Sequence, residues 1–200
     1  MSEIVEELKR PVLTFPKAEA QAVTQAFAAA GCILEYGSGG STLLAAGMPG
    51  KRVFTVESDA NWLAGLRRWF AVNPPRAKLV LHHADIGPTK AWGYPVDEKQ
   101  FRKWPGYPNS VWERPDFQHP DMVLIDGRFR LACLLTTMLR IKQPTVVLVD
   151  DYIDRGEYHE AELLQKPMAM IGRMARFELT PQPFPQDWMG WVAGSYLRLL

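Results

Sequence analysis

Five short apolar runs, each with an acidic residue at or just past its end, constrain the fold of this chain most strongly. The runs cover residues 32–36, 53–56, 77–82, 122–125 and 145–149, and their acids are Glu35, Glu57, Asp85, Asp126 and the pair Asp150 and Asp151. Runs of helix-forming residues precede the first of them, at 17–30, and lie between most of the others, at 41–46, 60–72 and 131–140. Such alternation predicts βαβ units with a parallel sheet, and ligands bind at the carboxyl ends of parallel strands. We therefore expect the acids to gather at one edge of the sheet.

The C-terminal part of the chain departs from this alternation. Its pattern predicts a helix over residues 160–171 and two strands over 176–179 and 191–199. The connection between these strands is short and rich in proline, which favours an antiparallel pair over a crossover. We predict an α/β fold with a seven-stranded, mostly parallel sheet, an antiparallel last strand pair and helices on both faces.

Composition narrows the class of protein. The 200 residues are 47% apolar with a net charge of +1, which suits one domain over residues 1–200. This balance argues against a disordered chain and against a nucleic-acid binder that relies on a broad positive field. There is no apolar run of about 18 residues, the start MSEIVEELKR is unlike a signal peptide, and the two cysteines are far apart. We expect a cytoplasmic protein with no membrane or nucleic-acid partner.

Residues 88–120 form an aromatic and proline-rich segment between the third and fourth predicted strands. They contain six of the 16 prolines, together with Trp92, Trp104 and Trp112. A flexible linker would be polar and poor in aromatic residues, so we interpret the segment as an ordered insertion packed on the domain. Its position after the third strand places it over the crevice, where it would act as a lid.

A glycine-rich turn follows the first predicted strand. Gly37 and Gly39 allow a tight turn and a close approach of the backbone to a ligand, and Ser41 can open the next helix. Glu57 stands 20 residues after Gly37 (57 − 37), where a carboxylate can accept hydrogen bonds from ribose hydroxyls. This spacing indicates a site for a ligand that contains a nucleoside.

These residues resemble the motifs of the class I, Rossmann-like S-adenosylmethionine-dependent methyltransferases. The first motif of that family, an acid followed by alternating glycines, falls on residues 35–41, with Ser41 in place of a third glycine. The family's ribose-binding acid falls on Glu57, and its acid near the adenine falls on Asp85. The resemblance implies S-adenosyl-L-methionine as cofactor and methyl transfer as the reaction. The implied cofactor-binding residues are Glu35, Gly37, Ser38, Gly39, Ser41, Glu57, Ser58, Asp85 and Asp126.

The acids after the fourth and fifth predicted strands would face the methyl acceptor. We expect O-methylation of a small molecule, in which catalysis consists mainly of alignment and removal of a proton from the nucleophile. Asp126, Asp150 and His159 are the candidate catalytic residues, and His159 is the candidate general base. A homodimer remains open, because the oligomeric state is not readable from the sequence.

The same acids are similar to the metal ligands of catechol-type O-methyltransferases, which hold magnesium after these two strands. Two departures argue against a metal here: Asp151 stands in place of that family's asparagine, and Phe129 in place of its lysine base. We therefore expect no metal, and arginines such as Arg128, Arg130 or Arg155 as the partners of the acids.

Two other functions remain as alternatives. A nicotinamide-dependent oxidoreductase would need a third glycine where Thr42 stands, and Glu35 would lie near its pyrophosphate. A methyltransferase-like protein that binds the donor or a partner without catalysis is the second alternative. The run Asn73-Pro74-Pro75 resembles the signature of amino-methyltransferases, but it precedes the third strand instead of following the fourth, so it does not indicate nucleic-acid methylation.

Overall fold

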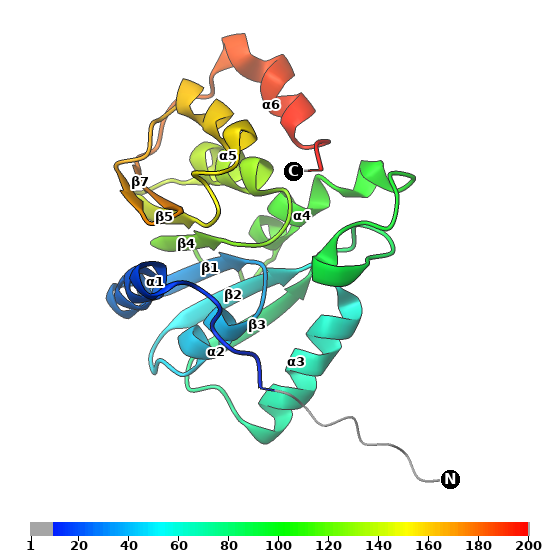
Figure 1. The fold of residues 1–200 in the computed structure, drawn as a ribbon, viewed down its shortest axis with the longest axis vertical. Helices are drawn as coiled ribbons and strands as arrows, with labels where there is room; N and C mark the ends of the chain where they lie inside the picture. Colours follow the sequence, from blue (N-terminus) through cyan, green and yellow to red (C-terminus); the bar gives the residue numbers. More distant parts are fainter. Residues whose placement is uncertain (1–9, 200) are drawn as a thin grey trace.

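Residues 10–199, which the computed structural model describes, contain a seven-stranded sheet in the order β3-β2-β1-β4-β5-β7-β6 (Figure 1). The strands are β1 (Cys32–Tyr36), β2 (Arg52–Glu57), β3 (Lys78–His83), β4 (Met122–Ile125), β5 (Thr145–Val149), β6 (Ala169–Ile171) and β7 (Met174–Leu179). The strands β1 to β5 pair in parallel, whereas β7 is antiparallel to both β5 and β6. The predicted α/β class is confirmed.

Helices cover both faces of the sheet (Figure 1). They are α1 (Lys17–Ala29), α2 (Gly40–Ala46), α3 (Ala60–Val72), α4 (Gly106–Asn109), α5 (Arg130–Arg140) and α6 (Met189–Ser195). Successive residues of a strand point to opposite faces, so Ile33 of β1 packs in one core cluster with Phe27 of α1, and Leu34 packs in another with Leu135 of α5. No helix within residues 10–199 is long and apolar enough to cross a membrane.

The last strand pair is antiparallel as predicted, and the strand predicted over 176–179 lies within β7, but its partner lies elsewhere than predicted. The hairpin consists of β6 and β7 joined at Gly172, whose φ is +55°, and residues 191–199 form no strand but contain the end of α6. Val192 and Ser195 are buried three residues apart, which is the spacing of a helix rather than of a strand. The predicted helix over 160–171 is also wrong: a 3₁₀ helix covers Gly156–Leu163, and β6 follows Pro167.

Residues 88–120 connect β3 to β4 and contribute to the core on the α5 side of the sheet. Trp104, Tyr107 and Val111 are buried in the same cluster as Phe129, and the Trp104 and Phe129 rings lie 5.4 Å apart. The hydroxyl of Tyr36 in β1 donates to the carbonyl of Pro108 at 2.6 Å. The segment thus covers one face of the sheet near β1 and β4, and it is not a detachable loop.

Candidate functional site

The turn after β1 packs directly against the turn after β4. Gly37 has a φ of +94°, and a Cβ at this position would lie 2.6 Å from the Cα of Gly127. Only glycine therefore fits, both for its backbone conformation and for this contact. The two turns hold the carboxyl ends of β1 and β4 together, and they bring Glu35 and Asp126 to the same region of the sheet edge, where the charge of Glu35 acts on Asp126.

Glu35 is fully buried and only half satisfied. Its Oε2 accepts hydrogen bonds from the hydroxyls of Thr42 and Thr55, both at 2.6 Å, whereas its Oε1 is buried with no partner within the described residues. Burial raises the pKa of this carboxyl to about 7, although the hydroxyl donors oppose the shift. The Thr42 oxygen also accepts from the Gly39 amide at 2.9 Å, so Glu35 is linked directly to the glycine turn.

Glu57 at the end of β2 has all its acceptor positions occupied by the chain itself. Its Oε2 accepts from the Ser38 amide at 3.2 Å and the Ser38 hydroxyl at 2.6 Å. Its Oε1 accepts from the amides of Ser58 at 2.8 Å and Asp59 at 2.9 Å. A carboxylate offers about four lone-pair positions, so a ribose hydroxyl could bind Glu57 only by replacing one of these donors.

A short hairpin from the 88–120 segment lies over Glu57. Residues 88–96 fold back on themselves through a bridge between Thr89 and Pro95, and the Gly93 carbonyl at the tip accepts from the Ser58 hydroxyl at 2.9 Å. Gly93 has a φ of +69°, and a Cβ there would lie 2.6 Å from the Ser58 oxygen and 3.2 Å from Glu57 Oε1. The hairpin tip is therefore in contact with the residues predicted to hold the ribose.

The remaining predicted cofactor residues are divided between the glycine turn and the end of β3. Ser41 is buried in the first turn of α2, and Gly39 faces open space. Asp85 lies outside this cluster with a side chain that is 58% exposed, and it accepts from Lys103 Nζ and the Gly87 amide. The Lys103 ammonium holds the pKa of Asp85 below its usual value. A role for Asp85 at the adenine would require it to exchange that partner.

The three acids after β4 and β5 form a compact cluster with two arginines. The carboxylates of Asp126, Asp150 and Asp151 have oxygens within 4.8 Å of one another. Arg130 contacts Asp126 at 3.2 Å and Asp151 at 3.2 Å, and Arg173 contacts Asp150 at 2.7 Å and Asp151 at 2.9 Å. A metal could bind these oxygens only if the guanidinium groups withdrew.

Sequence reasoning found one of these arginines and missed the other. Arg130 was among the expected partners, but Arg173 lies in the turn between β6 and β7, directly after residues 160–171, where the sequence predicted a helix and no hairpin. Burial is the main reason that the pKa of Asp126 is raised to about 7, and the Arg130 charge opposes this effect. Arg128 does not pair with an acid within the described residues but lies over the Tyr94 ring, 4.0 Å from its centroid.

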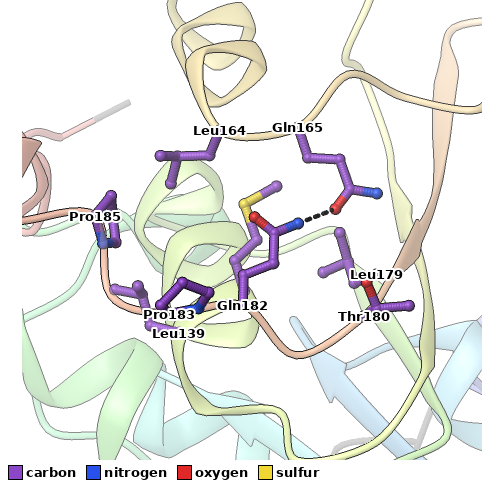
Figure 2. Close-up of a pocket in the computed structure, with 9 residues that line it drawn as sticks. Leu139, Leu164, Gln165, Leu179, Thr180, Gln182, Pro183 and Pro185 are labelled. Atoms are coloured by element: carbon purple, nitrogen blue, oxygen red, sulfur yellow. Dashed lines mark hydrogen bonds between the residues drawn. The ribbon is translucent and has the colours of Figure 1, made fainter.

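His159 makes its hydrogen bond to a backbone carbonyl and not to the aspartates of the cluster. Its ring is stacked on Tyr152 at 4.8 Å, its Nε2 is 3.0 Å from the Tyr152 carbonyl, and the residue is exposed. Within residues 10–199 no hydrogen bond joins it to Asp126 or Asp150. A small hollow lies away from these acids, between α5 and residues 179–185, where Gln182 donates to Gln165 at 3.2 Å (Figure 2). Its volume of about 30 Å³ suits a water molecule rather than a cofactor.

Comparison with known proteins gives one close likeness and several distant ones. No family model and no curated protein matches the chain. A methyltransferase-like protein from Silicibacter pomeroyi is 46% identical, with a TM-score of 0.89 over 94% of this chain and 98% of the other. The O-methyltransferase TomG from Streptomyces achromogenes, solved in complex with SAM, is 15% identical with a TM-score of 0.56 over 85% and 82% of the two chains.

A third structure extends the same likeness. The O-methyltransferase from Bacillus cereus, solved in complex with SAH, is 17% identical with a TM-score of 0.51, over 74% of this chain and 62% of the other. At this level of identity the two O-methyltransferases support the fold alone. The first comparison, at 46% identity over nearly the full length of both chains, establishes relationship.

Proposed function

Because this chain belongs to the family of a methyltransferase-like protein and has the fold of the class I, Rossmann-like S-adenosylmethionine-dependent methyltransferases, we propose that it binds S-adenosylmethionine and methylates an oxygen of a small molecule. The donor supplies, when bound, a methyl group on a positively charged sulfur. The residues of the chain must orient the donor, align the acceptor and accept a proton from it.

The half-satisfied carboxylate of Glu35 is the observation that carries this proposal. A buried acceptor without a partner costs free energy, and such groups are retained where a ligand or water completes them. Glu35 Oε1 is buried and unpartnered, and Oε2 connects through Thr42 to the glycine turn. A donor that carries an ammonium and a sulfonium fits a carboxylate at this position, whereas the pyrophosphate of a nicotinamide dinucleotide would be repelled. The chemistry of Glu35 and the glycine turn therefore fits a positively charged methyl donor.

The donor would be held by the glycine turn, by Glu57 through the ribose hydroxyls and by Asp85 near the adenine. The acceptor would enter beside Asp126, whose Oδ1 is bound by Arg130. With a pKa of about 7, Asp126 is suited to accept the acceptor's hydroxyl proton near neutral pH. Asp150 is almost fully buried and bound to Arg173, so we assign it a positioning role. His159 is exposed and has its own backbone partner, so it is the weakest of the three catalytic candidates.

One observation favours a second candidate, a methyltransferase-like protein that binds no donor. The four donors to Glu57 and the contact of Gly93 with Ser58 leave the ribose position filled by the chain's own atoms. Titration of the protein with S-adenosylhomocysteine separates the two candidates. We expect a Kd below about 1 mM, which corresponds to about −4 kcal/mol.

The same titration with Glu57→Gln tests the role of this carboxylate. We expect binding to weaken about 10- to 100-fold, because hydrogen bonds to a charged acceptor contribute about 1.5–3 kcal/mol. Glu98→Gln, which changes an exposed carboxylate in the same way, should bind as the wild type does. Absence of binding by the wild type, or binding of NADH instead, would exclude the donor assignment.

A further inference from the structure

The hairpin of residues 88–96 is held together by its own backbone hydrogen bonds. Its arms are joined by the hydrogen bonds from the Lys90 amide to the Tyr94 carbonyl at 2.8 Å and from the Val96 amide to the Pro88 carbonyl at 2.9 Å. Prolines in both arms restrict the backbone further. The hairpin is preceded by Gly87, which has a φ of +95° and so supplies a point where the chain can change direction.

The tip of the hairpin fits against the ribose acid only because it has no side chain there. Gly93 approaches Ser58 and Glu57 so closely that an added Cβ would overlap the Ser58 oxygen, at 2.6 Å. The Gly93 carbonyl accepts a hydrogen bond from the Ser58 hydroxyl, and the Ser38 hydroxyl donates to Glu57 Oε2. Gly93 donates nothing to Glu57, whose donors within the described residues belong to Ser38, Ser58 and Asp59. The hairpin tip instead fills the space beside Ser58 and Glu57 Oε1.

The hairpin tip combines buried residues with one strained, exposed residue. Gly93 and Pro95 are buried, and Arg128 stacks on the half-buried Tyr94. Trp92 has a φ of +64°, a conformation that bulky residues rarely adopt, and it is 85% exposed. The strain at Trp92 is therefore not offset by burial of its side chain, and it lowers the local stability of the closed position.

We propose that residues 88–96 form a displaceable plug: in the closed state Gly93 occupies the position of the donor ribose, and the donor binds after the plug has swung away from Glu57 and Ser58. This inference rests on the proposed function. It explains how Glu57 can be a donor-binding residue although the hairpin tip lies against it. The affinity for the donor is then lowered by the fraction of molecules in the open state.

Gly93→Ala tests the plug, because the new methyl group must displace the tip from Ser58. Gly50→Ala is a matched control. Gly50 also has a positive φ, of +77°, but a Cβ there meets nothing within 4 Å, and Gly50 precedes β2, at the opposite end of the strand from Glu57. Two quantities are measured for each protein, the hydrogen-exchange rates of the amides of residues 90–96 and the affinity for S-adenosylhomocysteine by calorimetry.

We expect Gly93→Ala to accelerate exchange in the hairpin and to strengthen binding at least about tenfold, since minor states are commonly populated at 0.1–10%. Gly50→Ala should change neither quantity. Arg128→Gln provides a second route to the open state, because it removes the stacking on Tyr94 without altering the tip, and it should change both quantities in the same direction.

Each other outcome overturns the plug. Unchanged or weaker binding in a variant whose hairpin exchanges faster would mean that the hairpin does not compete with the donor. Equal binding by all four proteins would refute the plug alone and leave the proposed function standing. If exchange shows an open hairpin and none of the proteins binds S-adenosylhomocysteine, both the plug and the donor assignment fail. If neither Gly93→Ala nor Arg128→Gln accelerates exchange, the hairpin is not displaceable.

Discussion

Replacing Glu35 by Gln should make the protein more stable above neutral pH while it weakens the donor site. The carboxylate is fully buried, and it retains one oxygen without a partner. Its ionised form is therefore poorly solvated in the folded state, and burial raises its pKa from 4.5 to about 7. Gln can accept the same two threonine hydroxyls with its carbonyl oxygen but carries no charge at any pH.

The size and sign of the effect follow from this shift. Between pH 4.5 and 7 the folded protein binds more protons at Glu35 than the unfolded chain does, so the free energy of unfolding falls as pH rises through this range. The full loss is about 3 kcal/mol, from about 2.5 pKa units at 1.36 kcal/mol each. Above pH 7 the loss is complete. Glu35→Gln does not have this loss, and its advantage over the wild type should grow by about 3 kcal/mol from pH 4.5 to pH 8.

Urea unfolding of the wild type and Glu35→Gln at pH 5, 6, 7 and 8 measures this difference directly. Burial also raises the pKa of Asp126 to about 7, and the Glu35 charge adds to that shift, so the two proteins are also compared in an Asp126→Asn background, where Glu35 alone differs. Glu98→Gln, at an exposed carboxylate, should follow the wild-type curve. A constant difference between Glu35→Gln and the wild type across these pH values would refute the reasoning.

Two further predictions concern the core and the acid cluster. Trp104→Ala should lower the free energy of unfolding by about 3–5 kcal/mol, because the indole is buried against Phe129. Trp188→Ala, at an exposed tryptophan, should lower it by only about 0.5 kcal/mol. Equal losses for the two variants in urea unfolding would contradict this prediction. Magnesium should leave the melting temperature unchanged with S-adenosylhomocysteine present, because Arg130 and Arg173 already bind Asp126, Asp150 and Asp151. A magnesium-dependent rise in melting temperature that disappears in Asp150→Asn would contradict this prediction.

The parallel half of the sheet was predictable from the sequence because each strand there is a short apolar run bounded by turn residues. Buried parallel strands are apolar on both faces, and this makes them distinct from amphipathic helices. The C-terminal part lacks this signal. The strand Ala169–Ile171 has only three residues and lies at the sheet edge, and Met189–Ser195 is a helix whose buried positions were interpreted as a strand. The secondary structure of short elements at the sheet edge depends on tertiary contacts, and the local sequence pattern does not reveal these contacts.

The acids of the site were also predictable, because strand ends in a parallel sheet converge on one edge. Their partners were not. Arg173 reaches Asp150 only because β7 inserts beside β5 in antiparallel direction, and nothing in the local sequence around Arg173 indicates that contact. The approach of Gly93 to Glu57 is equally invisible in sequence, since the two residues are brought together by the path of a 33-residue connection (residues 88–120) rather than by any motif.

The hydroxyl of Tyr36 has a consequence for the order in which the chain folds. This group in β1 is buried, and its two hydrogen-bond partners are the Pro108 carbonyl and the Trp112 indole, 72 and 76 residues further along the chain. The first strand of the sheet therefore has an unsatisfied buried group until residues 108–112 have arrived. Contacts of such long sequence separation slow folding, and during synthesis at the ribosome the central strand cannot complete its core until the segment before β4 has emerged.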